Sequence, residues 1–186
     1  MGRPRRIDRG QVLAEALAVA DEHGLDAVTM AGVAERLGVT PMALYRHVAN
    51  KADLLDGVVE LLLTEFPLPP SELPWPERLS ALAANIRTTA RRHPSVFPLL
   101  LQLPATTVEA RRTREAVYGA LSEAGVPEDR SGQVERLVST AILGFAVSEV
   151  AGRFRRHSRR QLDEDFDVLR TLLAAFIQSQ RASPAP

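Results

Sequence analysis

The sequence predicts an all-α fold. Apolar residues make up 45% of the 186 residues, enough for a buried core, whereas aromatic residues make up only 5%. The core must therefore be built mainly from Leu, Ala and Val, a composition that favours helices over sheets. Apolar residues recur at helical spacing along most of the chain, and no stretch keeps the strict alternation of a strand. The length allows one domain or two small ones.

The first element is a basic N-terminal segment, MGRPRRIDR. It carries four arginines, Arg3, Arg5, Arg6 and Arg9, against one acidic residue, Asp8. Two interpretations remain open: a solvated, unstructured tail, or a basic arm that lies along a polyanion.

Two amphipathic helices follow. The first begins at Asp8, which can form a capping box with Gln11, and ends at Gly24. The second begins after Thr29, a good N-cap, and is closed by Gly38, which can adopt the left-handed conformation. Their apolar faces consist of Val12, Leu13, Ala16, Leu17 and Ala20 in the first helix and Met30, Val33, Ala34 and Leu37 in the second.

The stretch GVTPMALYRHVANK predicts a third, short helix with an outward face. Thr40 is a good N-cap, and Pro41 suits the first helical position, where its missing N–H is no loss. Only Leu44 and Val48, four residues apart, form an inward stripe. The other side chains have little core to contact, so we interpret this helix, about two turns long, as one that is presented to a partner.

A fourth helix begins after the cap Asn50 and runs to about Phe66. The segment FPLPPSELPWP then contains five prolines, which predicts a stiff connector and the clearest domain boundary. Five further helices are expected at 77–92, 95–103, 107–124, 128–154 and 162–180. The expected domains are an N-terminal domain at 1–50, a second helical domain at 51–180 that helix 51–66 joins to the first, and a disordered tail at 181–186.

Two helices joined by a tight glycine turn, the second short and exposed, form a helix-turn-helix, whose second helix fits the major groove of DNA. Arg46 can bind guanine with both arms of its guanidinium, and Met42 and Ala43 can contact thymine methyl groups. Tyr45 and Lys51 suit phosphate oxygens, which fix register without reading sequence. The N–H groups at the start of the fourth helix offer a further phosphate site.

This region resembles a known family. Residues 8–55, and above all TMAGVAERLGVTPMALYRHVANKADLL, are similar to the DNA-binding domain of the tetracycline-repressor (TetR) family. The helical remainder fits that family's ligand-binding and dimerisation domain. The resemblance implies a homodimeric, sequence-specific transcriptional repressor that a small-molecule inducer releases from double-stranded operator DNA.

The resemblance also implies roles for single residues. Thr29 matches a phosphate contact at the start of the second helix. The base-reading positions are Thr40, Pro41, Met42 and Ala43, and the backbone or groove contacts are Tyr45, His47 and Lys51. Ala31 and Gly32 stand where the family often has basic side chains, so phosphate contacts are expected to be missing there. As a hypothesis, the arm with Arg3, Arg5 and Arg6 compensates by entering the adjacent minor groove.

A ligand pocket is expected among the helices of the second domain, for a small and largely apolar inducer. Its candidate apolar lining is Phe66, Trp75, Leu82, Ile86, Phe97, Leu100, Leu101 and Tyr118. The polar residues Asn85, His93 and Gln102 could orient a ligand within it. The alternative interpretation is plain core for the apolar residues and surface or helix-end positions for the polar ones.

The last two long helices are expected to form the subunit interface as a four-helix bundle. The candidate contacts are Leu143, Gly144, Val147 and Val150 in the first of them and Leu169, Leu172, Leu173 and Phe176 in the second. Between these helices lies RFRRHSRRQLDEDFD, whose charge changes sign abruptly. Adjacent opposite charges cancel beyond a Debye length, which favours a solvated turn with local salt bridges over a second nucleic-acid patch.

The remaining features argue against other classes of function. The chain has no cysteine, which excludes disulfides and thiolate chemistry, and its four histidines form no metal-spaced pair, so no metal or other cofactor is expected. Phosphate loops, nucleophile elbows and zincin motifs are absent, so we expect no enzymatic activity. The lack of a signal peptide or membrane span predicts a cytoplasmic protein without a membrane partner. The main alternative function is a helical protein–protein adaptor that does not bind DNA.

Overall fold

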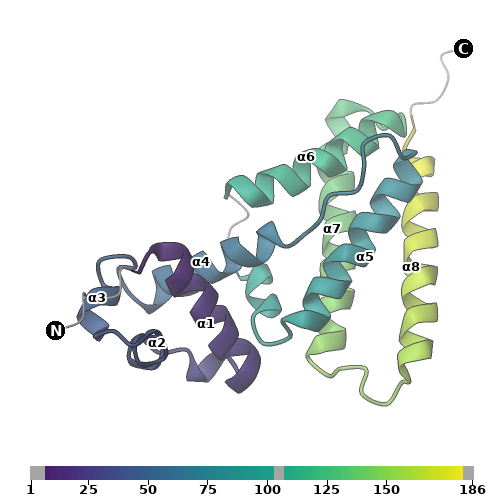
Figure 1. The fold of residues 1–186 in the computed structure, drawn as a ribbon. Helices are drawn as coiled ribbons and strands as arrows, with labels where there is room; N and C mark the ends of the chain where they lie inside the picture. The colour runs from purple at the N-terminus through teal and green to yellow at the C-terminus, as the bar shows by residue number, and fades with distance from the viewer. Residues whose placement is uncertain (1–6, 103–106, 182–186) are drawn as a thin grey trace, which may run out of the picture. The chain divides into compact units, whose positions relative to one another are not determined.

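The computed structural model describes residues 7–102 and 107–181, and every regular element in these ranges is helical (Figure 1). The elements are α1 Arg9–His23, the 3-10 helix η1 Leu25–Ala27, α2 Met30–Leu37, α3 Pro41–Leu44, α4 Lys51–Thr64, α5 Trp75–Arg92, the 3-10 helix η2 Phe97–Leu101, α6 Val108–Glu123, α7 Glu128–Val150 and α8 Arg159–Ser179. The predicted all-α class is confirmed.

The chain divides into two compact units. Unit 1 comprises Met1–Glu65 and Arg92–Pro104, and unit 2 comprises Phe66–Arg91 and Ala105–Pro186. The expected boundary at residue 50 differs from this division, because α4 packs against α1 and η2 and so belongs to the compact body of unit 1.

Unit 1 is built around α1, which packs against α2 and α4, while α3 packs against α2. Its core is aliphatic, as the composition predicts, and includes Val12, Ala16, Val33, Leu44, Val48, Leu54, Val58 and Leu62. Helices α1 and α4 approach closely at Gly57, where an added Cβ would lie 2.6 Å from Leu13 Cδ2. A side chain at position 57 would therefore force this packing apart.

Three predicted N-caps of unit 1 are confirmed. Asp8 and Gln11 form the capping box, because the Gln11 N–H donates to Asp8 Oδ1 (2.8 Å) and the Asp8 N–H donates to Gln11 Oε1 (3.2 Å). The Gly32 N–H donates to Thr29 Oγ1 over 3.0 Å, and Asn50 caps α4 in the same way. These bonds satisfy N–H groups that the first turn of a helix leaves without a partner.

In unit 2, α5, α7 and α8 run side by side, and α6 packs against α7 (Figure 1). The buried core includes Trp75, Leu82, Leu121, Val134, Ile142, Phe166 and Ile177. The proline-rich segment before α5 is held by hydrogen bonds, since Asn85 Nδ2 donates to the Pro67 carbonyl (2.6 Å) and Arg78 Nη1 to the Ser71 carbonyl (2.7 Å).

Several boundaries differ from the sequence prediction. The expected helix at 95–103 is only the short 3-10 helix η2, whose second residue is a proline that cannot donate a backbone hydrogen bond. Helix α7 ends at Val150 rather than 154, because Gly152 takes the left-handed conformation (φ +74°). Helix α8 begins at Arg159, three residues early, because Ser158 and Gln161 form a capping box that the prediction overlooked.

A search for membrane-crossing segments within residues 7–102 and 107–181 finds no helix that combines the length and the apolarity that a span requires.

Candidate nucleic-acid interface

The turn between α2 and α3 is fixed by its glycine. Gly38 has φ +68°, a conformation that glycine adopts without strain. The Val39 N–H donates to the Ala34 carbonyl (3.0 Å) and the Gly38 N–H to the Glu35 carbonyl (3.0 Å), the Schellman pattern that closes a helix. This tight turn is the one that the helix-turn-helix interpretation requires.

Helix α3 is anchored by two side chains and exposes most of the others. Leu44 and Val48 are 0% and 1% exposed, which confirms the inward pair, whereas Met42 is 71% and Tyr45 50% exposed. Thr40, Pro41, Arg46 and Lys51 are exposed as well, while Ala43 and His47 are half-buried. Within unit 1 the outer side of α3 is therefore free for a partner.

The helix itself is shorter than expected. It is a single turn, Pro41–Leu44, rather than about two, and Tyr45–His47 continue as turns, with the His47 and Val48 N–H groups both donating to the Leu44 carbonyl. Thr40 occupies the N-cap position, but its side chain makes no capping hydrogen bond. Its hydroxyl is therefore not used by the helix.

Arg9 is not part of a free basic arm. Its guanidinium donates to the His47 carbonyl (Nη1, 2.7 Å) and to Asp53 Oδ1 (Nη2, 2.7 Å). The hydrogen bond from Arg9, and then the one from the Ala49 N–H, lower the pKa of the Asp53 carboxyl below its ordinary value. Arg9 thus ties α1 to the segment that joins α3 and α4, and sequence reasoning missed this role.

The predicted phosphate site at the start of α4 is partly occupied by the protein itself. Asn50 Oδ1 accepts the Asp53 N–H (3.0 Å), and Asp53 Oδ2 accepts the Ala49 N–H (2.6 Å). Lys51 remains exposed there. Thr29 is exposed but uses its hydroxyl oxygen to cap α2, and Arg3, Arg5 and Arg6 lie outside the described residues.

Two polar side chains of the expected ligand pocket are engaged elsewhere. His93, 5% exposed, places Nδ1 2.7 Å from Asp21 Oδ2 and Nε2 3.0 Å from Glu65 Oε2, all within unit 1. Asn85 holds the Pro67 carbonyl in unit 2. These bonds leave neither ring nitrogen of His93 for a ligand, which speaks against its expected role.

The other expected lining residues are divided between the units. Trp75 and Leu82 belong to the buried core of unit 2, with Ile86 and Tyr118 packed against it. The remaining members are Phe66, which is buried in unit 2, and Phe97, Leu100, Leu101 and Gln102, which lie in unit 1. Leu101 and Gln102 are exposed, and Phe97 is fully buried. A ligand-lining role for these residues stays a prediction.

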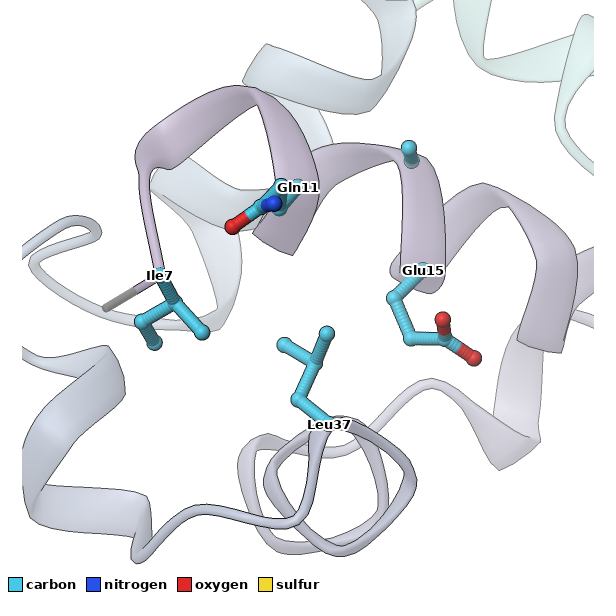
Figure 2. A pocket seen from close by; sticks show the side chains of 5 residues that line it. Ile7, Gln11, Glu15 and Leu37 are labelled. Atoms are coloured by element: carbon cyan, nitrogen blue, oxygen red, sulfur yellow. The ribbon is translucent and has the colours of Figure 1, made fainter. Parts of the chain in front are cut away.

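An open pocket of about 260 Å³ lies beside α1 in unit 1 (Figure 2). Ile7 and Leu37 face each other across it, with Gln11, Ala14 and Glu15 along α1. It contains none of the expected lining residues, and it is smaller than the roughly 300–1,000 Å³ typical of small-molecule sites. We therefore do not assign the inducer to it.

The expected dimer surface is partly used within the protomer. Leu169, Leu173 and Phe176 pack against the core of unit 2, whereas Leu172 is 61% exposed. Leu143, Gly144, Val147 and Val150 on α7 are half-buried. The exposed apolar residues that the sequence interpretation missed here are Leu137 and Val168, which are 51% and 58% exposed.

Side chains that could hold a metal ion do not cluster anywhere in the two described ranges. Arg36 links α2 to α1 through ion pairs with Glu15 and Glu22, so this basic side chain of α2 serves the fold.

Fold and interface together define a helix-turn-helix protein with a second, helical unit. Two family models match the chain: bacterial regulatory proteins of the tetR family at residues 12–58, and the tetracyclin repressor-like C-terminal domain at residues 79–176. The second match alone covers more than half of the chain, and the protein belongs to the tetR family of bacterial regulatory proteins.

Individual relatives agree with this assignment. An HTH-type transcriptional regulator of Saccharopolyspora erythraea is 27% identical over 79% of this chain and 63% of its own length. The chain spans only 41–63% of the length of three such curated relatives.

Solved structures resemble the whole chain. BioQ with its double-stranded DNA operator is 28% identical, with a TM-score of 0.79 over 94% of this chain and 99% of BioQ. A TetR variant of Acinetobacter baumannii in complex with minocycline is 28% identical, with a TM-score of 0.82 over 95% and 100% of the two chains.

Proposed function

We propose that the protein is a homodimeric transcriptional repressor that binds operator DNA through α3 and leaves it when a small molecule binds unit 2. The observation that carries this proposal is the contrast on α3 between buried Leu44 and Val48 and exposed Met42 and Tyr45. A one-turn helix held by two side chains adds little to the core, so its exposed side is best explained by a partner. The solved complex of BioQ with its operator supports DNA as that partner.

In this proposal the residues divide into two roles. Arg46, Met42 and Ala43 contact base edges, together with the chain at Thr40 and Pro41. Tyr45, His47, Lys51 and Thr29 contact the phosphate backbone or the groove wall, and the arm residues Arg3, Arg5 and Arg6 enter the minor groove. The two copies of α3 in the dimer lie about 34–36 Å apart, in successive major grooves of a near-palindromic site.

Dimerisation is proposed to bury the exposed apolar side chains of α7 and α8, Leu137, Val168 and Leu172, together with the half-buried Gly144 and Val147. Apolar side chains at these exposures on two neighbouring helices form a surface that a second copy can cover in a four-helix bundle. The protein acts in the cytoplasm and is not an enzyme.

Inducer binding is proposed to act on α4 through His93. This residue follows α5 directly in the chain and contacts Glu65, which caps the C-terminal end of α4, as well as Asp21 of α1. A displacement of α5 would therefore pull on both ends of this link. Inducer and DNA favour different positions of α4, so each weakens the binding of the other by the same factor.

Retardation of the DNA that flanks its own gene, in the presence of excess competitor DNA, tests the proposal. Arg46→Ala should relax base preference in the half-site, at a cost of about 1–3 kcal/mol for the preferred sequence. Lys51→Ala should weaken binding to all sequences about equally. If the two variants behave alike, the division of roles is wrong, and if the wild-type protein prefers no sequence, an adaptor function becomes the better account.

A further inference from the structure

The turn between α7 and α8, residues 151–158, is rigidly built and rich in arginine. Gly152 closes α7 in the left-handed conformation, with the Arg153 N–H donating to the Ser148 carbonyl (3.0 Å). The ring of Phe154 lies 5.5 Å from the ring of Phe145, which in turn lies 5.2 Å from that of Phe166. The turn is thus anchored by its one aromatic residue, and its arginines are exposed.

The acidic residues beside this turn do not neutralise it, although the sequence suggests that they would. Glu149 is bound by Arg87 (Oε2 to Nε, 2.6 Å) and by Arg91 (Oε1 to Nη2, 2.7 Å), and its side chain is only 10% exposed. Asp163 pairs with the same two arginines, over 2.9 Å and 2.8 Å. Both carboxylates are therefore compensated from α5.

The next carboxylates are also largely used. Glu164 pairs with Arg160 (2.8 Å), and Asp167 pairs with Arg170. Within the described part of the chain, four arginines of the turn and the start of α8 have no side-chain partner, and one nearby carboxylate, Asp165, has none. These four are Arg153, Arg155, Arg156 and Arg159, here called the arginine turn. The expected neutral, salt-bridged turn is corrected: only the Arg160–Glu164 pair is local.

We infer that the arginine turn binds the phosphate backbone of DNA, as a sequence-independent contact in addition to α3. Guanidinium groups bind phosphate oxygens with two parallel hydrogen bonds, and exposed, unpaired arginines are free to do so. Residues 151–160 contain no exposed large apolar side chain, which argues against a membrane or an apolar protein surface as the partner. This inference rests on the proposed function.

The test is a triple variant of the full-length protein, Arg153→Gln, Arg155→Gln and Arg156→Gln. Dissociation constants for the operator and for a scrambled duplex of equal length are measured by fluorescence anisotropy between about 50 and 200 mM salt. We expect both to rise by the same factor, at least about tenfold at the lowest salt, and the slope of log K against log salt to fall by up to about 2.7, roughly 0.9 for each lost phosphate contact. Preference for the operator over the scrambled duplex should persist.

A matched control removes the same charge elsewhere in unit 2, through Arg111→Gln, Arg130→Gln and Arg136→Gln, all at exposed positions. The inference predicts a nearly unchanged salt slope for this control, with circular dichroism confirming that both variants fold. Equal slopes in the two triple variants would overturn it. So would an unchanged DNA slope with lost binding to phosphatidylglycerol vesicles, which would assign the turn to a membrane. Failure of the proposed function looks different, because wild type itself would then prefer no operator.

Discussion

Two helices in this chain end in the same glycine motif, yet the segments that follow them differ. After Gly38 (φ +68°) comes α3, whose exposed side mixes apolar and polar groups with a single arginine, Arg46. After Gly152 (φ +74°) comes the arginine turn, with four unpaired guanidinium groups. The first surface has the variety that base edges demand, whereas the second offers only charge and suits a uniform phosphate chain.

The two segments are also held differently. Helix α3 is fixed by aliphatic packing of Leu44 and Val48, while the α7–α8 region is fixed by ion pairs of α5 arginines and a stack of aromatic rings. Arg87 lies over the Phe166 ring at 4.6 Å from its centroid, so charge and aromatic packing act together there. Disturbing each segment separately therefore sharpens the comparison.

The largest effect is expected for Leu44→Ala, which removes the fully buried anchor of α3. Unfolding in urea should show a loss of about 2–5 kcal/mol, from lost burial and the cavity left behind. Met42→Ala, at a side chain 71% exposed, is the matched control and should change stability by less than about 0.5 kcal/mol. Equal losses in both variants would mean that α3 is not presented as described.

His93→Ala should cost about 1–3 kcal/mol, because Asp21 and Glu65 each lose a hydrogen-bonding partner in a buried site. Operator affinity should fall as well, since the C-terminal cap of α4 is released. His23→Ala is the control, as that ring is 63% exposed beside Glu22. Thermal unfolding and DNA binding measured on both variants decide the matter, and a His93→Ala protein as stable as the control would refute the link.

Gly38→Ala and Gly152→Ala should each cost about 1–2 kcal/mol, because alanine is strained at positive φ. Gly119→Ala in α6, where an added Cβ meets nothing within 4 Å, should instead stabilise the protein by up to about 1 kcal/mol. Calorimetry of the three variants measures the difference. The Gly38 variant should affect sequence preference and the Gly152 variant the salt slope, and the reverse pattern would break the comparison.

The smallest effect is expected for Asp53→Asn, which removes the partner of Arg9, a pair that is 42% and 34% exposed. The loss at neutral pH should be below about 1 kcal/mol. Because the pKa of Asp53 is lowered in the folded protein, its contribution is present above the ordinary carboxyl pKa and is lost as pH falls through the folded value. Urea midpoints of wild type and variant should therefore converge below about pH 4, and a constant difference down to pH 2 would contradict this.

The sequence predicts the fold class and the α3 surface well, because both depend on local signals. The caps Asp8, Thr29 and Asn50 and the turn glycine Gly38 act through neighbours three or four residues away. The first boundaries to fail were those where local signals compete, as at η2.

Long-range pairing was beyond the sequence. Nothing near Arg9 in the chain indicates that it binds Asp53, 44 residues away. The charge balance of the arginine turn failed for the same reason, since the partners of Glu149 and Asp163 lie on α5, about 60 to 75 positions earlier. The burial of Glu149, which its neighbours in sequence do not predict, is what separates the two charge patterns.

The most direct test of the central claim is selection of bound duplexes from a random DNA pool by the purified protein, followed by sequencing. The account predicts enrichment of a near-palindrome whose half-sites are centred about 34–36 Å apart, and loss of that enrichment with Arg46→Ala. A pool that stays random after repeated rounds, while the protein remains folded, would contradict it.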